Sequence, residues 1–173
     1  MADEVANAHR FCVHGDKSMI MDDSKFMALA IEEARKGLRA GERPFGAVVV
    51  CKDEIVAQTY SIVESSGDPT SHAETLAIRA ATAHLKSRFL KGCTLYASCE
   101  PCPMCAGAMF ASHVERLVIG ASSEVLTRLT GWPSRSYSVE ELSKQMNFKL
   151  EVIRGVLADK AEQVLAAYKW HES

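Results

Sequence analysis

Helices and strands are predicted to alternate along most of this 173-residue chain, and this alternation restricts the fold more than any other feature. An amphipathic helix is predicted from Asp22 to about Gly41, and a β-hairpin follows with strands at 45–51 and 55–61. A polar loop is expected at 64–70. Further helices are expected at 72–85, about 102–112, 139–145 and 157–168, and further strands at 94–98, 116–120 and 148–153. Because strands joined by helical crossovers run parallel, the order predicts an α/β fold, a three-layer α/β/α sandwich with a mixed five-stranded sheet.

The length of 173 residues, with 47% hydrophobic content, suits one compact domain that buries about two thirds of its unfolded surface. We expect residues 1–17 to be an N-terminal extension and residues 18–173 to be a single domain. The N-terminus lacks the features of a secretory signal, and no apolar run reaches the roughly 18 to 20 residues of a membrane helix. A soluble, cytoplasmic protein is therefore expected, with six cysteines used for metal binding, catalysis or packing rather than for disulfides.

The charge balance argues against a polyanionic partner. The chain has 20 Lys and Arg against 22 Asp and Glu, a net charge of -2 and a pI near 6.3. No global field therefore draws it to nucleic acid, whose binding requires Lys and Arg across the contact face. We expect a small-molecule substrate, and nucleic acid stays open as the less favoured partner.

Two predicted helices begin with potential metal ligands. His72 and Glu74 lie in the first turn of one helix, and Cys102 and Cys105 lie in the first turn of the other. Residues three apart share a helix face, so both thiolates can bind one ion, and His72 can supply a third ligand. Three protein ligands leave a fourth position open, which is typical of catalytic zinc sites. The pattern therefore predicts one Zn²⁺ per chain.

Glu74 is expected to transfer protons next to this ion. Zinc can lower the pKa of a bound water from about 15.7 to about 7, and Glu74, two residues from His72, is placed to take the proton. His72 to Glu74 and Pro101 to Cys105 together resemble the H-x-E…P-C-x-x-C signature of zinc deaminases. That resemblance implies that the same carboxylate protonates the ring nitrogen beside the attacked carbon and then the leaving amine, and that the reaction is hydrolytic deamination.

Cys99 is expected to be a packing or pocket-wall residue rather than a ligand. Pro101 starts the helix after it and leaves Cys99 at the strand end, and a third thiolate would close the coordination sphere. An iron-sulfur cluster is not favoured because the fourth cysteine of its usual pattern is replaced by Met109. A redox pair is not favoured because Cys102 and Cys105 would both be bound to zinc.

The segments around these residues resemble known deaminases. His72-Ala73-Glu74 followed by Pro101-Cys102-Pro103-Met104-Cys105 is the H-x-E…P-C-x-x-C signature known for zinc deaminases. With "PFGAVVV" at 44–50, "DPTSHAET" at 68–75 and "SCEPCPMCAGAMFAS" at 98–112, the chain resembles the cytidine deaminase superfamily in its nucleobase and tRNA-adenosine branch. The resemblance covers about 25–168 and implies a cytidine-deaminase-like fold and a homodimer or larger homo-oligomer.

The substrate is expected to be a free nucleobase or a related amino-heterocycle. The motifs "PFGA" and "SCEPCPMC" resemble guanine deaminases, whereas "AGAM" and residues 146–165 resemble the tRNA-adenosine type, and charge favours the small substrate. The main hypothesis is a guanine-, cytosine/isocytosine- or aminotriazine-like ring, deaminated in nucleobase salvage with release of ammonia. The alternatives are a tRNA or nucleoside adenosine deaminase and a non-catalytic subunit stabilised by zinc, and Glu74 argues against the latter.

Substrate contacts follow from the resemblance. Phe45 is expected to stack on the ring, Ser61 stands where relatives have an Asn that bonds the base, and the backbone at Ala73 and Pro101 would line the pocket. The acidic segment of guanine deaminases has no counterpart in 120–133. Candidates for a lid are Trp132, Tyr137, Trp170 and His171.

Overall fold

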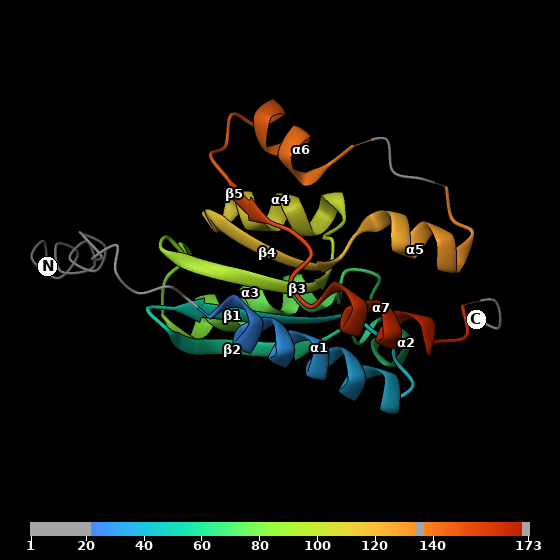
Figure 1. Cartoon of the computed structure of the whole chain (residues 1–173). Helices are drawn as coiled ribbons and strands as arrows, with labels where there is room; N and C mark the ends of the chain where they lie inside the picture. The colour runs from blue at the N-terminus through green and yellow to red at the C-terminus, as the bar shows by residue number, and fades with distance from the viewer. Residues whose placement is uncertain (1–21, 134–136, 171–173) are drawn as a thin grey trace, which may run out of the picture.

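The computed structural model describes residues 22–133 and 137–170. The predicted extension at 1–17, the predicted domain start at residue 18 and the lid candidate His171 lie outside these ranges. Within them, the strands are β1 (Gly46–Cys51), β2 (Glu54–Tyr60), β3 (Cys93–Cys99), β4 (Arg116–Ala121) and β5 (Glu151–Ile153). The helices are α1 (Asp23–Arg39), α2 (Val63–Ser66), α3 (Ala73–His84), α4 (Pro103–Ala111), α5 (Ser123–Thr130), α6 (Val139–Gln145) and α7 (Ala158–Ala166) (Figure 1).

The strands form a five-stranded sheet in the order β2-β1-β3-β4-β5. Strand β1 runs antiparallel to both β2 and β3, whereas β4 runs parallel to both β3 and β5. The predicted mixed sheet is thus confirmed, including the parallel pairing that the helical crossovers required. The carboxyl ends of β3 and β4 meet at one edge, which is where ligand sites form in such sheets.

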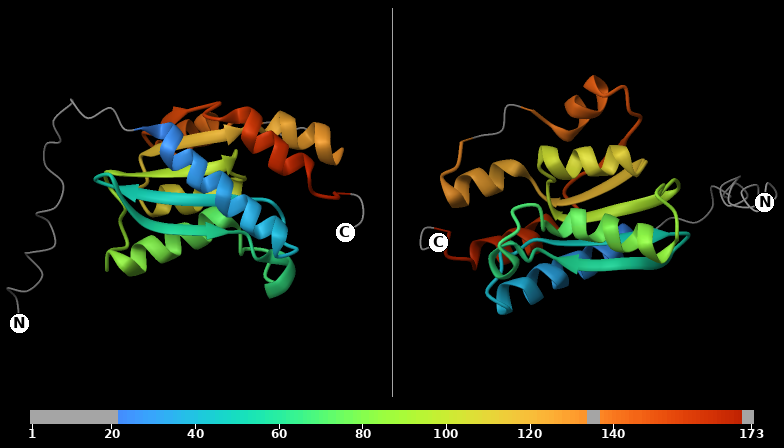
Figure 2. Two further views of the ribbon diagram at one scale, coloured as in Figure 1. Left: turned by 60° about the horizontal axis from the view of Figure 1, so that its bottom comes forward. Right: turned by 180° about the vertical axis from the view of Figure 1, so that it is seen from behind.

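Helices cover both faces of the sheet, which confirms the three-layer sandwich (Figure 2). On β3, Leu95 and Ala97 point to the layer that contains α3 and α4, while Tyr96 points to the layer that contains α1 and α7. This alternation follows from the two-residue period of a strand. Both faces are apolar because both are covered, so β3 is buried along its whole length. No helix among the described residues is both long enough and apolar enough to cross a membrane.

Gly46 allows α1 to pack closely against the start of β1. A Cβ atom at this position would lie 2.1 Å from the carbonyl oxygen of Ala30, which no side chain tolerates. The amide of Gly46 donates a hydrogen bond to Oγ of Ser98 at 2.9 Å. This bond fixes the start of β1 beside the end of β3, at the edge that carries the cysteine motif.

Part of the predicted polar loop at 64–70 is helical. Helix α2 forms because the carboxylate of Glu42 accepts hydrogen bonds from the amides of Glu64 and Ser65, both at 2.9 Å. Glu42 is only 2% exposed and lies more than 20 residues earlier in the chain. A cap from a distant residue leaves no local signal, so the sequence does not reveal this helix.

The expectation that the cysteines form no disulfide is wrong for one pair. Cys51 and Cys93 are opposite each other on β1 and β3, with Cα atoms 4.3 Å apart, and are joined as a disulfide. Their separation of 42 residues hides this pairing from sequence reasoning, because it depends on the strand register.

Candidate metal centre and active site

The loop before α3 positions His72. The Oδ1 atom of Asp68 accepts a hydrogen bond from the amide of Thr70 at 2.8 Å, and Oδ2 accepts one from Oγ of Ser71 at 2.9 Å. His72 follows with extended backbone as the N-cap residue of α3. The turn at Asp68 therefore fixes where the imidazole enters the site.

The structure brings His72, Cys102 and Cys105 together. Nδ1 of His72 lies 3.6 Å from Sγ of Cys102 and 3.5 Å from Sγ of Cys105, and the two sulfur atoms are 3.5 Å apart. Among the residues that the structure describes, these three form a group whose ligand atoms lie within 4.8 Å of one another. Two thiolates and an imidazole are soft to intermediate donors that suit zinc, and three of them leave the fourth tetrahedral position open.

The electrostatics of the group favour a bound cation. The hydrogen-bond contact with Cys105, together with the contact with His72, lowers the pKa of Cys102 to about 4. The same contact and burial raise the pKa of Cys105. The hydrogen bond with Cys102 raises the pKa of His72. Metal ligands bind in their deprotonated forms, so a divalent cation would compete with protons for these three side chains.

Glu74 lies beside the group and is 7% exposed. Its Oε2 atom accepts a hydrogen bond from the Cys105 thiol at 3.5 Å. Burial, followed by the negative charge on Cys102, raises the pKa of Glu74. A carboxyl group with a raised pKa next to a cation site can both take up and release a proton, as general acid-base chemistry requires.

Cys99 is placed apart from the group. It is 3% exposed and packs in the apolar cluster that contains residues of α1 and α7. Cys105, in contrast, belongs to α4 on the other face of the sheet. The run of three cysteines is therefore divided between two layers.

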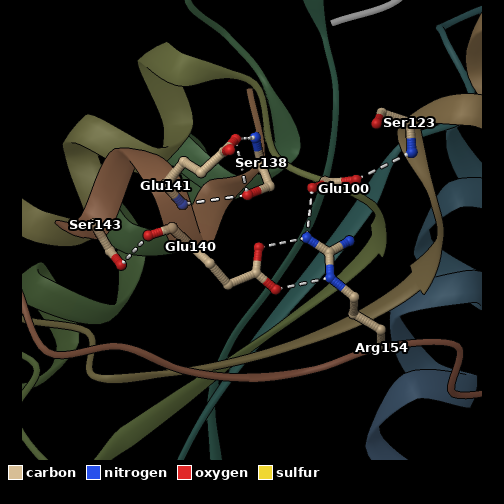
Figure 3. A network of polar contacts seen from close by, with 7 residues as sticks. All are labelled: Glu100, Ser123, Ser138, Glu140, Glu141, Ser143 and Arg154. Carbon is tan, nitrogen blue, oxygen red and sulfur yellow. Dashed lines mark hydrogen bonds and ion pairs between the residues drawn. The ribbon is translucent and has the colours of Figure 1, made fainter. Parts of the chain in front are cut away.

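A polar network anchors the segment that leads into Cys102. Glu100 accepts hydrogen bonds from the Arg154 guanidinium at 2.8 Å and from the amide of Ser123 at 3.1 Å (Figure 3). Arg154 also donates to Glu140, at 2.8 Å through Nε. Glu100 thus connects the ends of β3 and β5 with the starts of α5 and α6.

The predicted substrate contacts are all buried or half-buried. Phe45 is half-buried at the start of β1, and Pro101 is buried directly before Cys102. Ala73 is fully buried, and its carbonyl accepts a hydrogen bond from Oγ1 of Thr59 at 2.7 Å. Ser61 is 1% exposed, and its hydroxyl donates to the carbonyl of Ser71 at 3.4 Å.

Sequence reasoning missed three residues that support the site. Thr59 fixes the first turn of α3, and Ser98 fixes the start of β1. Arg43 lies within electrostatic reach of the metal group, since its charge acts to lower the pKa of His72 against the stronger contacts that raise it. The only signal for Arg43 is its place beside Pro44-Phe45 in the motif that precedes β1.

Comparisons with known proteins add to this geometry. The family model of the cytidine and deoxycytidylate deaminase zinc-binding region matches residues 20–121. A tRNA-specific adenosine deaminase of Bacillus subtilis is 38% identical over 146 residues, which cover 84% of this chain and 88% of that protein. A solved structure from studies of A-to-I editing by tRNA:A34 deaminases has a TM-score of 0.70 and 29% identity, covering 82% of this chain and 99% of that one. The guanine deaminase of Nitrosomonas europaea has a TM-score of 0.72 and 27% identity, covering 82% and 81%.

These likenesses contradict two predictions made from the sequence. The free-nucleobase substrate, with its role in salvage, and the preference for a small-molecule partner over nucleic acid are both wrong, because sequence relatives that match across most of their length are named for tRNA. The net charge of -2 is a sum over the whole chain, so it carries no information on which residues surround one site.

Proposed function

Because this chain belongs to the cytidine and deoxycytidylate deaminase family, a family of zinc-dependent hydrolytic enzymes, we propose that it converts adenosine to inosine in tRNA. The observation that carries the proposal is the likeness to a tRNA-specific adenosine deaminase, which extends over most of both chains. The grouping of His72, Cys102, Cys105 and Glu74 supports it, because this donor set and carboxylate suit the hydrolysis of a cyclic amidine.

We assign His72, Cys102 and Cys105 as the zinc ligands. A zinc ion bound there would supply the Lewis acid that lets a water molecule ionise near neutral pH. The protein holds its three ligand atoms on two helix starts, and the Asp68 turn and the Glu100 network fix those starts. Ligand atoms held in this way need little rearrangement on binding.

Glu74 is assigned as the proton carrier. Its carboxylate takes a proton from the attacking water and delivers it to N1 of the adenine ring as the oxygen bonds to C6. The second proton goes to the exocyclic amine, the C6–N bond breaks, and ammonia leaves. The balanced reaction is adenosine plus water to inosine plus ammonia. The burial that raises the pKa of Glu74 keeps the carboxyl group ready to hold the proton between these steps.

We assign Phe45, Ala73 and Pro101 to the pocket that receives the base. Chemistry on a base requires that it leave its stack, and unpaired loop nucleotides meet this requirement at the lowest free-energy cost. Ser61 stays a proposed contact of the base, and its hydroxyl also supports the loop before His72 by donating to the carbonyl of Ser71.

Incubation of the zinc-loaded protein with an anticodon stem-loop tests the function. The substrate carries adenosine at the wobble position, and digestion to nucleosides followed by mass spectrometry measures inosine. Inosine should form in the stem-loop and not in the same sequence held as a full duplex, where the target base stays stacked. Free guanine and cytosine serve as the contrasting substrates. Ammonia release from a free base without inosine formation in the stem-loop would overturn the proposal.

A further inference from the structure

Four aromatic side chains and one arginine form one cluster. Trp170 lies with its ring centroid 5.8 Å from Phe45, 5.8 Å from Trp132 and 4.8 Å from Tyr168. The guanidinium carbon of Arg43 lies 5.8 Å from the ring centroid of Trp132. We call these five residues the aromatic platform. They come from the α1–β1 connection, the end of α5 and the end of α7, which lie at the same end of the molecule (Figure 1).

The aromatic platform adjoins the proposed base pocket through Phe45. Phe45 directly precedes β1 and is a proposed wall of that pocket. Its ring contacts Trp170, which in turn contacts Trp132, and Arg43 lies two residues before Phe45 and over the ring of Trp132. A ligand bound over Arg43 and Trp132 would therefore lie on the same cluster as the proposed pocket wall.

Hydrogen bonds and an ion pair hold the residues of the aromatic platform in place, and one of them, Trp132, is exposed to solvent. The indole of Trp170 donates a hydrogen bond to the carbonyl of Leu165 at 3.0 Å, and Glu64 holds the Arg43 guanidinium at 2.6 Å. The amide of Trp132 donates to Oγ1 of Thr130 at 3.0 Å, while the residue stays 45% exposed. A large apolar ring held in a defined position without burial is an unusual use of tryptophan, and it suits a surface that stacks on a partner.

We propose that Trp132, together with Arg43, stacks on an unpaired nucleotide that flanks the target adenosine in the tRNA anticodon loop. The inference rests on the proposed function and deepens it. Unpaired RNA bases bind by stacking on aromatic rings and on arginine planes, and any base presents the required face. Such a contact also explains how a chain with a net charge of -2 holds RNA, since stacking does not depend on an excess of cations.

A double-mutant cycle between protein and RNA tests the contact. The protein variant is Trp132→Ala, and the RNA variants carry an abasic site directly 5′ or 3′ of the target adenosine. Trp132→Ala should lower kcat/KM for inosine formation about tenfold, mainly through KM, and one of the abasic sites should do the same. The Trp132→Ala variant acting on that abasic RNA should show a loss in kcat/KM of about tenfold rather than about a hundredfold, because the two changes remove the same stacking contact. Trp132→Phe should restore most of the loss.

A matched control lies at the other end of β3. Arg88 stacks over Phe89 with 4.4 Å from guanidinium carbon to ring centroid, and Phe89 is 37% exposed in the segment before β3. Phe89→Ala should leave kcat/KM unchanged. Both tryptophans of the chain belong to the aromatic platform, so quenching of the intrinsic fluorescence by the stem-loop gives a second readout.

The possible failures are distinguishable. No inosine from the wild-type protein would overturn the proposed function and this inference with it. Inosine formation with additive losses for Trp132→Ala and both abasic sites would overturn the stacking contact alone. Loss of self-association in Trp132→Ala, with unchanged kcat/KM, would show instead that a second copy of the chain covers the ring.

Discussion

The Oε2 atom of Glu74 lies 3.5 Å from Sγ of Cys105, so the proposed proton carrier contacts a proposed metal ligand. The two residues come from α3 and α4, which pack on the same face of the sheet. Because Glu74 is not one of the three residues of the ligand group, it can act on a substrate without leaving the metal short of a ligand.

The variant Glu74→Gln separates these two roles. It keeps the size of the side chain but cannot carry a proton, so kcat for inosine formation should fall by about 10²- to 10⁴-fold. Zinc content, measured by metal analysis, should stay near one ion per chain. Glu33→Gln is the control, because Glu33 is also buried but lies on α1, in the layer across the sheet. Unchanged turnover in Glu74→Gln would remove Glu74 from the mechanism.

The cysteines should differ in metal binding. Cys102→Ser should lose most of its zinc, since serine replaces a thiolate that the contacts in this group already favour. Cys99→Ser should keep about one zinc per chain, because Cys99 packs on the other face of the sheet. Metal analysis after dialysis against a weak chelator compares the two. Zinc loss in Cys99→Ser at unchanged folding would contradict the assignment.

Local patterns were enough to predict the fold and the ligand group. The helix from Asp22 has its cap and its apolar face in adjacent residues, and the predicted helix at 139–145 forms with Ser138 as its cap, in a capping box with Glu141. The helix starts at His72 and Cys102 depend on nearby turn residues. Each of these caps and turns lies within a few residues of the helix start that it specifies, so it can be recognised in the sequence.

Several features that escaped prediction, although not helix α5, depend on contacts between distant residues. Helix α2 requires the Glu42 carboxylate, and the disulfide requires the register of β1 against β3. The aromatic platform gathers three separate segments, of which the sequence marked Trp132 and Trp170 as lid candidates without showing that they meet. The substrate prediction was wrong for a related reason: the net charge of the chain does not say where its charged residues lie in the fold.

The capping of α2 by Glu42 should be measurable as stability. Glu42→Ala leaves the part-buried amides of Glu64 and Ser65 without their acceptor, which should lower the free energy of unfolding by about 1 kcal/mol. Urea denaturation followed by circular dichroism measures the change. Glu54→Ala, at an exposed position of β2, should change it by less than about 0.5 kcal/mol. Equal stability of the two variants would show that water replaces the Glu42 cap.

An ion pair between Asp23 and Arg116 connects the start of α1 to the sheet, and it should make the stability of the fold decrease in acid. Arg116 on β4 donates hydrogen bonds to both carboxylate oxygens of Asp23, at 3.0 and 2.9 Å, and the Tyr96 hydroxyl donates to the same carboxylate at 2.8 Å. Burial acts to raise the pKa of Asp23, but the hydrogen bonds from Arg116 and Tyr96 outweigh it and lower the pKa. The folded state therefore favours the ionised carboxylate.

The sign of the pH dependence follows from this lowered pKa. Stability from Asp23 is present above the unfolded pKa of 3.8 and is lost as the pH falls through the lower folded value. Asp23→Asn should be less stable than the wild type by about 1 to 3 kcal/mol at pH 7, and the gap should shrink below about pH 4. Urea denaturation at a series of pH values measures it. Titration of the metal group affects both proteins equally, so it cancels in the difference. A gap that stays constant from pH 7 to pH 3 would show that the ion pair does not stabilise the fold through the charge of Asp23.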